Sequence, residues 1–174
     1  MINELQQIFG SRTKSLEILY LINDLKKVVR HGFYQHELNK IISFCSENKL
    51  FLEKSPYKVS LIEKSKFSDK GAVIPVGSDN GMFLVYISKD QEKALKTCLY
   101  ETKQDHLSTG FMLNYPKCCA EFFVKKFVEG IVNPIHKPTD PWTNLTLRDN
   151  DLVLISHFPC SSDCKESIEI ALEE

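Results

Sequence analysis

Four of the six cysteines stand in two short motifs that are far apart in the chain. Cys118 and Cys119 are adjacent and follow a proline closely, and Cys160 and Cys164 follow another proline in a C-x-x-x-C pattern. A thiolate binds zinc and iron–sulfur clusters, and it is also the nucleophile of thiol chemistry. Both motifs stand at predicted helix starts, where free N–H groups and the helix dipole stabilise an anion. We therefore expect the four cysteines to form one functional site.

The residues alone leave four interpretations open: unrelated buried thiols, structural disulfides, a bound metal or iron–sulfur cluster, and a redox or nucleophilic thiol site. Disulfides are uncommon in the cytosol, which counts against the second. The C-x-x-x-C pattern falls within zinc-ligand spacing, and His157, just upstream, is a further candidate ligand. Adjacent side chains on a helix diverge by about 100°. Cys118 and Cys119 can therefore bind one centre only at a helix entry or through a multi-atom cluster.

Other candidate residues surround these motifs. His106 precedes the Cys118–Cys119 helix and can approach the same site, although a core or surface histidine is the commoner outcome. Ser167 follows Cys164 by about one helical turn and is expected to support the site with a hydrogen bond to sulfur. Cys45 and Cys98 continue apolar helical stripes and are expected in the core. No residue is assigned a catalytic role.

Helical spacing of apolar residues predicts the elements that carry these residues. Helices are expected over residues 11–30, 34–49, 88–103, 116–133 and 163–172, with a capping box at Ser88-x-x-Gln91. Runs rich in Val, Ile, Phe and Tyr predict strands at 58–63, 72–76, 82–88 and 152–157, the first three as an antiparallel meander. Residues 133–150 hold three prolines and are expected to form a loop.

These elements predict an α+β fold, a small antiparallel sheet packed with about five helices. We expect residues 1–54 to form an N-terminal helical hairpin. Residues 55–174 should form the α+β domain that carries the cysteine site, and the two parts should make one compact unit.

Composition and charge exclude several classes of protein. The 174 residues are 43% hydrophobic and 26% charged, which excludes low-complexity and collagen-like chains. The net charge of −1 gives no overall attraction to nucleic acid or to a membrane. No apolar stretch approaches the ~20 residues of a membrane span. The start of the chain lacks the features of a signal peptide, so the expected location is the cytoplasm.

The cysteine motifs also resemble those of a known group of proteins. The run Tyr-Pro-Lys-Cys-Cys-Ala-Glu-Phe-Phe at 115–123 and the run His-Phe-Pro-Cys-Ser-Ser-Asp-Cys-Lys-Glu-Ser at 157–167 are similar to domain-of-unknown-function family 483 of prokaryotes. Asn114 stands where that family usually has Gly, and Asn tolerates left-handed geometry. The resemblance implies that the four cysteines and His157 belong to one site, and it supplies no substrate.

The sequence therefore predicts a cytoplasmic protein whose four cysteines, with His157, bind zinc or an iron–sulfur cluster. Thiol redox or sulfur-transfer activity is a further expectation if the site keeps an open coordination position. The alternative is a non-enzymatic module, stapled by a metal or by disulfides, that binds a protein or RNA. A basic face formed by Lys14, Lys26, Lys27 and Arg30 on the first long helix leaves RNA contact open. The partner is otherwise a small molecule or protein of unidentified kind, and no membrane is expected.

Overall fold

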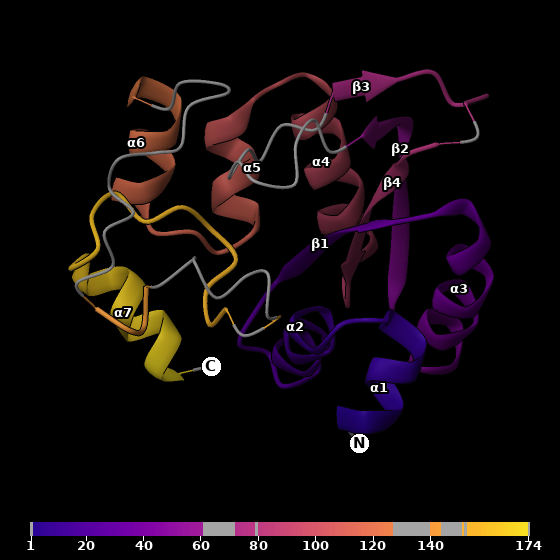
Figure 1. Ribbon diagram of the computed structural model, residues 1–174, viewed down its shortest axis with the longest axis horizontal. Helices are drawn as coiled ribbons and strands as arrows, with labels where there is room; N and C mark the ends of the chain where they lie inside the picture. The colour runs from indigo at the N-terminus through magenta and orange to yellow at the C-terminus, as the bar shows by residue number, and fades with distance from the viewer. Residues whose placement is uncertain are drawn as a thin grey trace.

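The computed structural model describes residues 2–60, 72–78, 80–126, 140–143, 151 and 153–173. Within these residues, seven α-helices and one short 3-10 helix accompany a four-stranded antiparallel sheet (Figure 1). The predicted α+β fold is confirmed, with two short helices, α1 and α5, in addition to the five expected.

The sheet has the strand order β1-β4-β2-β3, with β1 at Val28–Phe33, β2 at Phe51–Ser60, β3 at Ala72–Ile74 and β4 at Met82–Ser88. The strand predicted at 82–88 has the expected bounds, whereas β2 begins earlier than predicted. The predicted meander is wrong, because β4 pairs with β1 and β2 and not with β3. The central place of β4 follows from its composition, Met-Phe-Leu-Val-Tyr-Ile-Ser, which suits burial on both faces.

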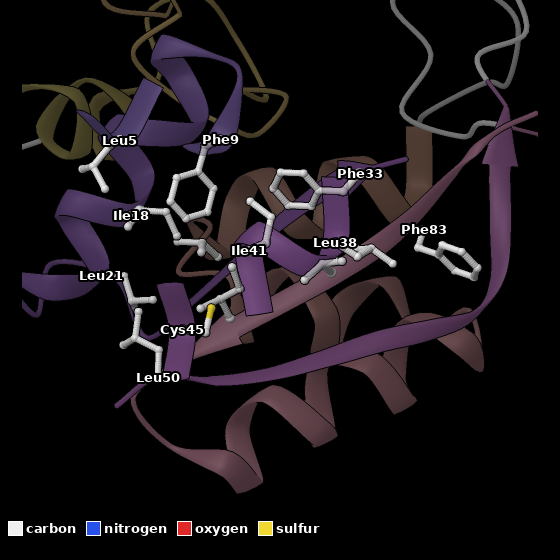
Figure 2. Packing of buried hydrophobic residues seen from close by; sticks show 13 residues of the cluster. Leu5, Phe9, Ile18, Leu21, Phe33, Leu38, Ile41, Cys45, Leu50 and Phe83 are labelled. Atoms are coloured by element: carbon white, nitrogen blue, oxygen red, sulfur yellow. The ribbon is translucent and has the colours of Figure 1, made fainter. Parts of the chain in front are cut away.

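Helices cover both faces of the sheet. On one face, α1 (Ile2–Phe9), α2 (Arg12–Ile22) and α3 (Leu38–Glu47) bury the alternate β4 residues Phe83, Val85 and Ile87. Figure 2 shows Phe9, Ile18 and Ile41 among the side chains gathered in this core. On the other face, Tyr86 packs with Cys98 of α4 (Gln91–Thr102) and with Leu113, which follows α5 (His106–Met112). The alternation along β4 is the period of two that a strand imposes.

The N-terminal helix prediction is wrong after Ile22. The helix α2 ends there, Asp24 takes a positive φ of 64°, and the chain then enters β1. Val29 fits the helical spacing of the preceding Leu and Ile residues, but pairing of β1 with β4 outweighs that local pattern. The second predicted helix is present as a 3-10 turn, Gln35–Glu37, followed by α3. Because β1 lies between α2 and α3, these helices do not form the predicted hairpin; the division at residue 54 stays a prediction.

The helices next to the cysteines differ from the prediction in detail. The helix α4 is capped by Asp90, whose carboxylate accepts the N–H of Glu92 at 2.9 Å; the predicted Ser88 capping box is not formed. Ser88 instead ends β4 and donates to the Lys27 carbonyl. The helix α5 was not predicted; it has only seven residues and is capped by Asp105.

The C-terminal part consists of α6 (Lys117–Lys126) and α7 (Lys165–Glu173), which lie at one end of the molecule, away from α3 (Figure 1). The strand predicted at 152–157 is wrong over the described residues 153–157, which are not in a strand. Ile155 packs instead against Ala171 of α7. The predicted continuation of α6 to residue 133, and the predicted loop except for residues 140–143, lie outside the described residues. Among the described helices, none has the length and apolar character needed to span a membrane.

Candidate metal centre

The four cysteines of the two motifs meet in one cluster. Their sulfur atoms all lie within 4.8 Å of one another. The Cys118 and Cys119 sulfurs are 3.8 Å apart, and the Cys164 sulfur lies 3.7 Å from Cys118 and 3.6 Å from Cys119. This arrangement can hold a metal ion.

Two helix starts position the cluster, as the sequence predicts. Cys118 and Cys119 lie in the first turn of α6, which begins after Pro116, whose carbonyl accepts the Ala120 N–H at 2.9 Å. Cys164 immediately precedes α7, and its carbonyl accepts the N–H of Ile168 at 3.0 Å. The positive ends of two helix dipoles therefore face the sulfurs, which favours negative charge there.

The loop before α7 brings the fourth cysteine to the cluster. The Cys160 N–H donates to the Cys119 sulfur at 3.3 Å, so backbone and side chain of this residue both take part. Thr143 donates to the Ser162 carbonyl and ties a second loop to this segment. The adjacent Cys118 and Cys119 reach one point because they lie at a helix entry, one of the two conditions derived from the sequence.

Ser167 connects the cluster to His157. The Ser167 hydroxyl is fully buried and lies 3.3 Å from the Cys119 sulfur and 2.8 Å from the His157 Nε2. The spacing after Cys164 pointed to a Ser167–sulfur hydrogen bond. The link from Ser167 to His157 was missed, because no periodic pattern connects a loop residue to a helix residue ten positions later.

His157 contacts the cluster through Ser167. The group of possible metal ligands consists of the four cysteines and does not include His157. Its ring packs against the Tyr115 ring, with centroids 5.1 Å apart, and Tyr115 donates to the Ser156 carbonyl at 3.2 Å. Burial, followed by the positive charge of Lys26, lowers the pKa of His157 to about 3. A neutral imidazole that supports a hydroxyl fits this environment, and direct ligation by His157 stays a prediction.

The other candidate residues take ordinary places. The His106 ring packs edge-on against the Phe123 ring at 5.4 Å, and among the described residues no contact joins it to the four sulfurs. Cys45 and Cys98 are 2% and 7% exposed and belong to the two sides of the core, as predicted.

The expected basic face is wrong. Lys26 is buried and pairs with Glu17, and its Nζ also contacts the Ser156 hydroxyl at 3.0 Å. His31 Nε2 lies 2.9 Å from the second oxygen of Glu17. Arg30 pairs with Glu101. Lys26, Lys27 and Arg30 follow the end of α2, so they do not share a helical face with Lys14. The Lys26–Ser156 contact instead connects the N-terminal part to the segment that leads to the cysteines.

The thiols have unequal tendencies to ionise. Burial and the neighbouring Cys164 raise the pKa of Cys118 to about 12, and burial also raises the pKa of Cys119. Burial opposes ionisation of Cys164, but hydrogen bonds from the hydroxyl and N–H of Ser167 hold its pKa below the ordinary value. Four thiolates this close together repel one another, and a bound cation removes that repulsion.

All six cysteines are free thiols. The sulfur separations of 3.6–3.8 Å in the cluster are well beyond the roughly 2.05 Å of a disulfide bond. The disulfide interpretation therefore does not describe this structure.

We compared the chain with protein-family models, with curated proteins and with solved structures, and found no match in any of the three. The resemblance to domain-of-unknown-function family 483 thus rests on the cysteine motifs alone and stays a prediction.

Proposed function

We propose that Cys118, Cys119, Cys160 and Cys164 bind one zinc ion. The observation that carries this proposal is the spacing of the sulfurs. Four sulfurs at about 2.3 Å from one tetrahedral ion lie about 3.8 Å from each other. The three separations measured among Cys118, Cys119 and Cys164 are 3.6–3.8 Å, close to that value.

A single ion fits this spacing better than an iron–sulfur cluster. A cluster places more than one iron between its cysteines and so spreads their sulfurs further apart. All four sulfurs lie within 4.8 Å here, which favours one central ion. Tetrahedral coordination by four thiolates is typical of structural zinc.

The proposed role of the ion is to fasten the C-terminal segment to α6. Four protein ligands leave no position open for a substrate, which is the pattern of structural and not of catalytic zinc. Two of the ligands come from α6 and two from the segment that leads into α7. We therefore favour the non-enzymatic alternative, a zinc-stapled module, and a reducing cytoplasm suits its free thiols.

The test is metal analysis of the untagged protein purified without oxygen and without chelator. We expect one zinc per chain and a colourless solution. Cys119→Ser and Cys164→Ser should lose the zinc, because each removes a ligand from a closed set. Cys45→Ala and Cys98→Ala are matched controls, since these cysteines lie in the core, and both should retain it.

Two results would overturn the proposal. Protein without stoichiometric metal would exclude the zinc site. Coloured protein that contains iron in place of zinc would assign the cysteines to iron chemistry.

A further inference from the structure

The four sulfurs form two pairs with different surroundings. Cys119 and Cys164, here called the inner pair, are buried, whereas Cys118 and Cys160, the outer pair, are partly exposed. Each motif contributes one cysteine to each pair. The difference between the pairs suggests that they have different tasks.

Hydrogen bonds to sulfur distinguish Cys119 from the outer pair. The Cys119 sulfur accepts the Cys160 N–H and lies beside the Ser167 hydroxyl, both at 3.3 Å. The Cys164 sulfur is buried and lies 3.5 Å from the Glu166 carboxylate. Within the described part of the chain, no N–H or hydroxyl donor contacts the outer sulfurs, which contact only other sulfurs and, for Cys118, the Glu166 carboxylate.

Hydrogen bonds change the reactivity of a metal-bound thiolate. A donor draws negative charge from the sulfur and stabilises the thiolate, which makes it a weaker nucleophile. Burial also blocks the approach of a reagent, and reactive cysteines are typically accessible. Cys119 is protected by both criteria, and Cys164 is protected by its burial. The outer sulfurs are partly exposed and, within the described residues, accept no hydrogen bond from an N–H or hydroxyl. The Glu166 carboxylate contacts Cys164 as well as Cys118, so its charge does not distinguish the two pairs.

We propose, on the basis of the zinc site proposed above, that the outer pair is the nucleophilic face of the centre and takes up alkyl groups from soft carbon electrophiles. In this step the Cys118 or Cys160 thiolate forms a bond to the electrophilic carbon. The carbon–leaving-group bond breaks, and the leaving group departs with its electron pair. No proton is released, because the zinc-bound sulfur is already a thiolate. The inner pair keeps its bonds to zinc.

The test is limited alkylation of the zinc-loaded protein with iodoacetamide, followed by tryptic digestion and fragment-ion mass spectrometry. Cleavage after Lys117, Lys125, Arg148 and Lys165 releases residues 118–125 and 149–165. Each peptide carries one outer and one inner cysteine, so each provides its own internal comparison. We expect the outer cysteine of both peptides to react about tenfold faster. At Cys119 this ratio corresponds to roughly one charge-assisted hydrogen bond, and at Cys164 it reflects burial of the sulfur.

The zinc content of the same sample separates the two proposals. If the sample holds zinc and the inner cysteines react as fast as the outer ones, this inference is wrong and the zinc site stands. If the sample holds no zinc, both proposals fail together.

A variant tests the hydrogen bonds directly. Ser167→Ala removes the hydroxyl beside the Cys119 sulfur, and we expect Cys119 to react several-fold faster relative to Cys118. The matched control is Ser161→Ala in the loop before α7, because the Ser161 hydroxyl interacts with Asp163. In this variant the ratio of the Cys119 rate to the Cys118 rate should stay at the wild-type value. An unchanged ratio in zinc-loaded Ser167→Ala would contradict the proposed control by hydrogen bonding.

Discussion

The two ends of the molecule are held together in different ways. Between the sheet and helices α1 to α3, thirteen buried residues form one continuous core (Figure 2). Around α7 the corresponding apolar cluster of the described residues has two buried members, Ile155 and Ala171, with four partly buried neighbours. Burial of one large apolar side chain contributes about 1.5–3 kcal/mol, so packing contributes much more to the first region than to the second.

Polar contacts also help to hold the C-terminal segment in place. Asp151 accepts hydrogen bonds from the Ser11 hydroxyl at 2.7 Å and the Thr13 N–H at 3.0 Å, at the start of α2. Lys26 reaches Ser156, and Tyr115 packs on His157. A typical hydrogen bond contributes only about 1 kcal/mol. We therefore expect the proposed zinc ion to contribute most of the stability of the C-terminal segment.

Removal of the metal has the largest expected effect. Structural zinc contributes on the order of 10 kcal/mol to the folding of small metal-dependent units. With a strong chelator, we expect the amides of α7 to lose protection against hydrogen exchange while those of β4 keep theirs. Exchange measured by mass spectrometry resolves the two segments. Equal loss of protection in α7 and β4, or none in either, would contradict the proposed division.

Truncation in the apolar core should have the converse effect. Phe9 is fully buried and packs edge-on against Phe44, with centroids 5.1 Å apart. Phe9→Ala should lower the free energy of unfolding by about 3–5 kcal/mol in urea titrations and leave the zinc content unchanged. The control is Val124→Ala on α6, where the side chain is 52% exposed. This variant should change the free energy of unfolding by less than about 0.5 kcal/mol. Loss of zinc in folded Phe9→Ala would show that the two regions are not separate.

His157 should make the protein sensitive to acid. Its pKa is about 3 in the folded protein, against 6.5 ordinarily, so the unfolded chain takes up a proton first as the pH falls. The contribution of His157 to the free energy of unfolding is therefore constant above pH 6.5. It decreases by a few kcal/mol in all as the pH falls from 6.5 towards 3. We expect the imidazole resonances of His157, assigned with His157→Gln, not to titrate between about pH 8 and pH 5. A midpoint near pH 6.5 in the folded protein would contradict this.

The smallest effect is expected where α5 packs against α6. A Cβ added at Gly110 would lie 3.1 Å from the Cβ of Ala120, next to Cys119. Ala120 cannot rotate its methyl group away, so Gly110→Ala should destabilise the protein by about 1 kcal/mol despite its better helix propensity. Gly77→Ala is the control, because nothing lies within 4 Å of the added Cβ. Thermal unfolding compares the two, and equal melting temperatures would show that this contact is loose.

Local signals were enough to predict much of the fold. The strand at 82–88 follows from composition, and the helices predicted to start at 116 and 163 start at Lys117 and Lys165. The strand β1 was missed because Val29 continues a helical pattern, and only pairing with β4 decides the conformation of this segment. Long-range pairing of this kind leaves no trace in a local window of sequence.

The candidate site shows the same limit. The cysteine motifs, and Ser167 one turn after Cys164, were visible in the sequence. Which sulfurs are buried was not, because that depends on how the segment at 160–164 lies against α6. The Ser167–His157 hydrogen bond likewise exists only in the folded chain.

The proposed four-sulfur zinc site can be tested by X-ray absorption at the zinc edge of the purified protein, because this measurement reports the atoms bound to the metal. We expect four sulfur neighbours at about 2.3 Å and no other ligand. A nitrogen neighbour at about 2.0–2.1 Å would place a histidine such as His157 in the coordination sphere and contradict the four-sulfur centre.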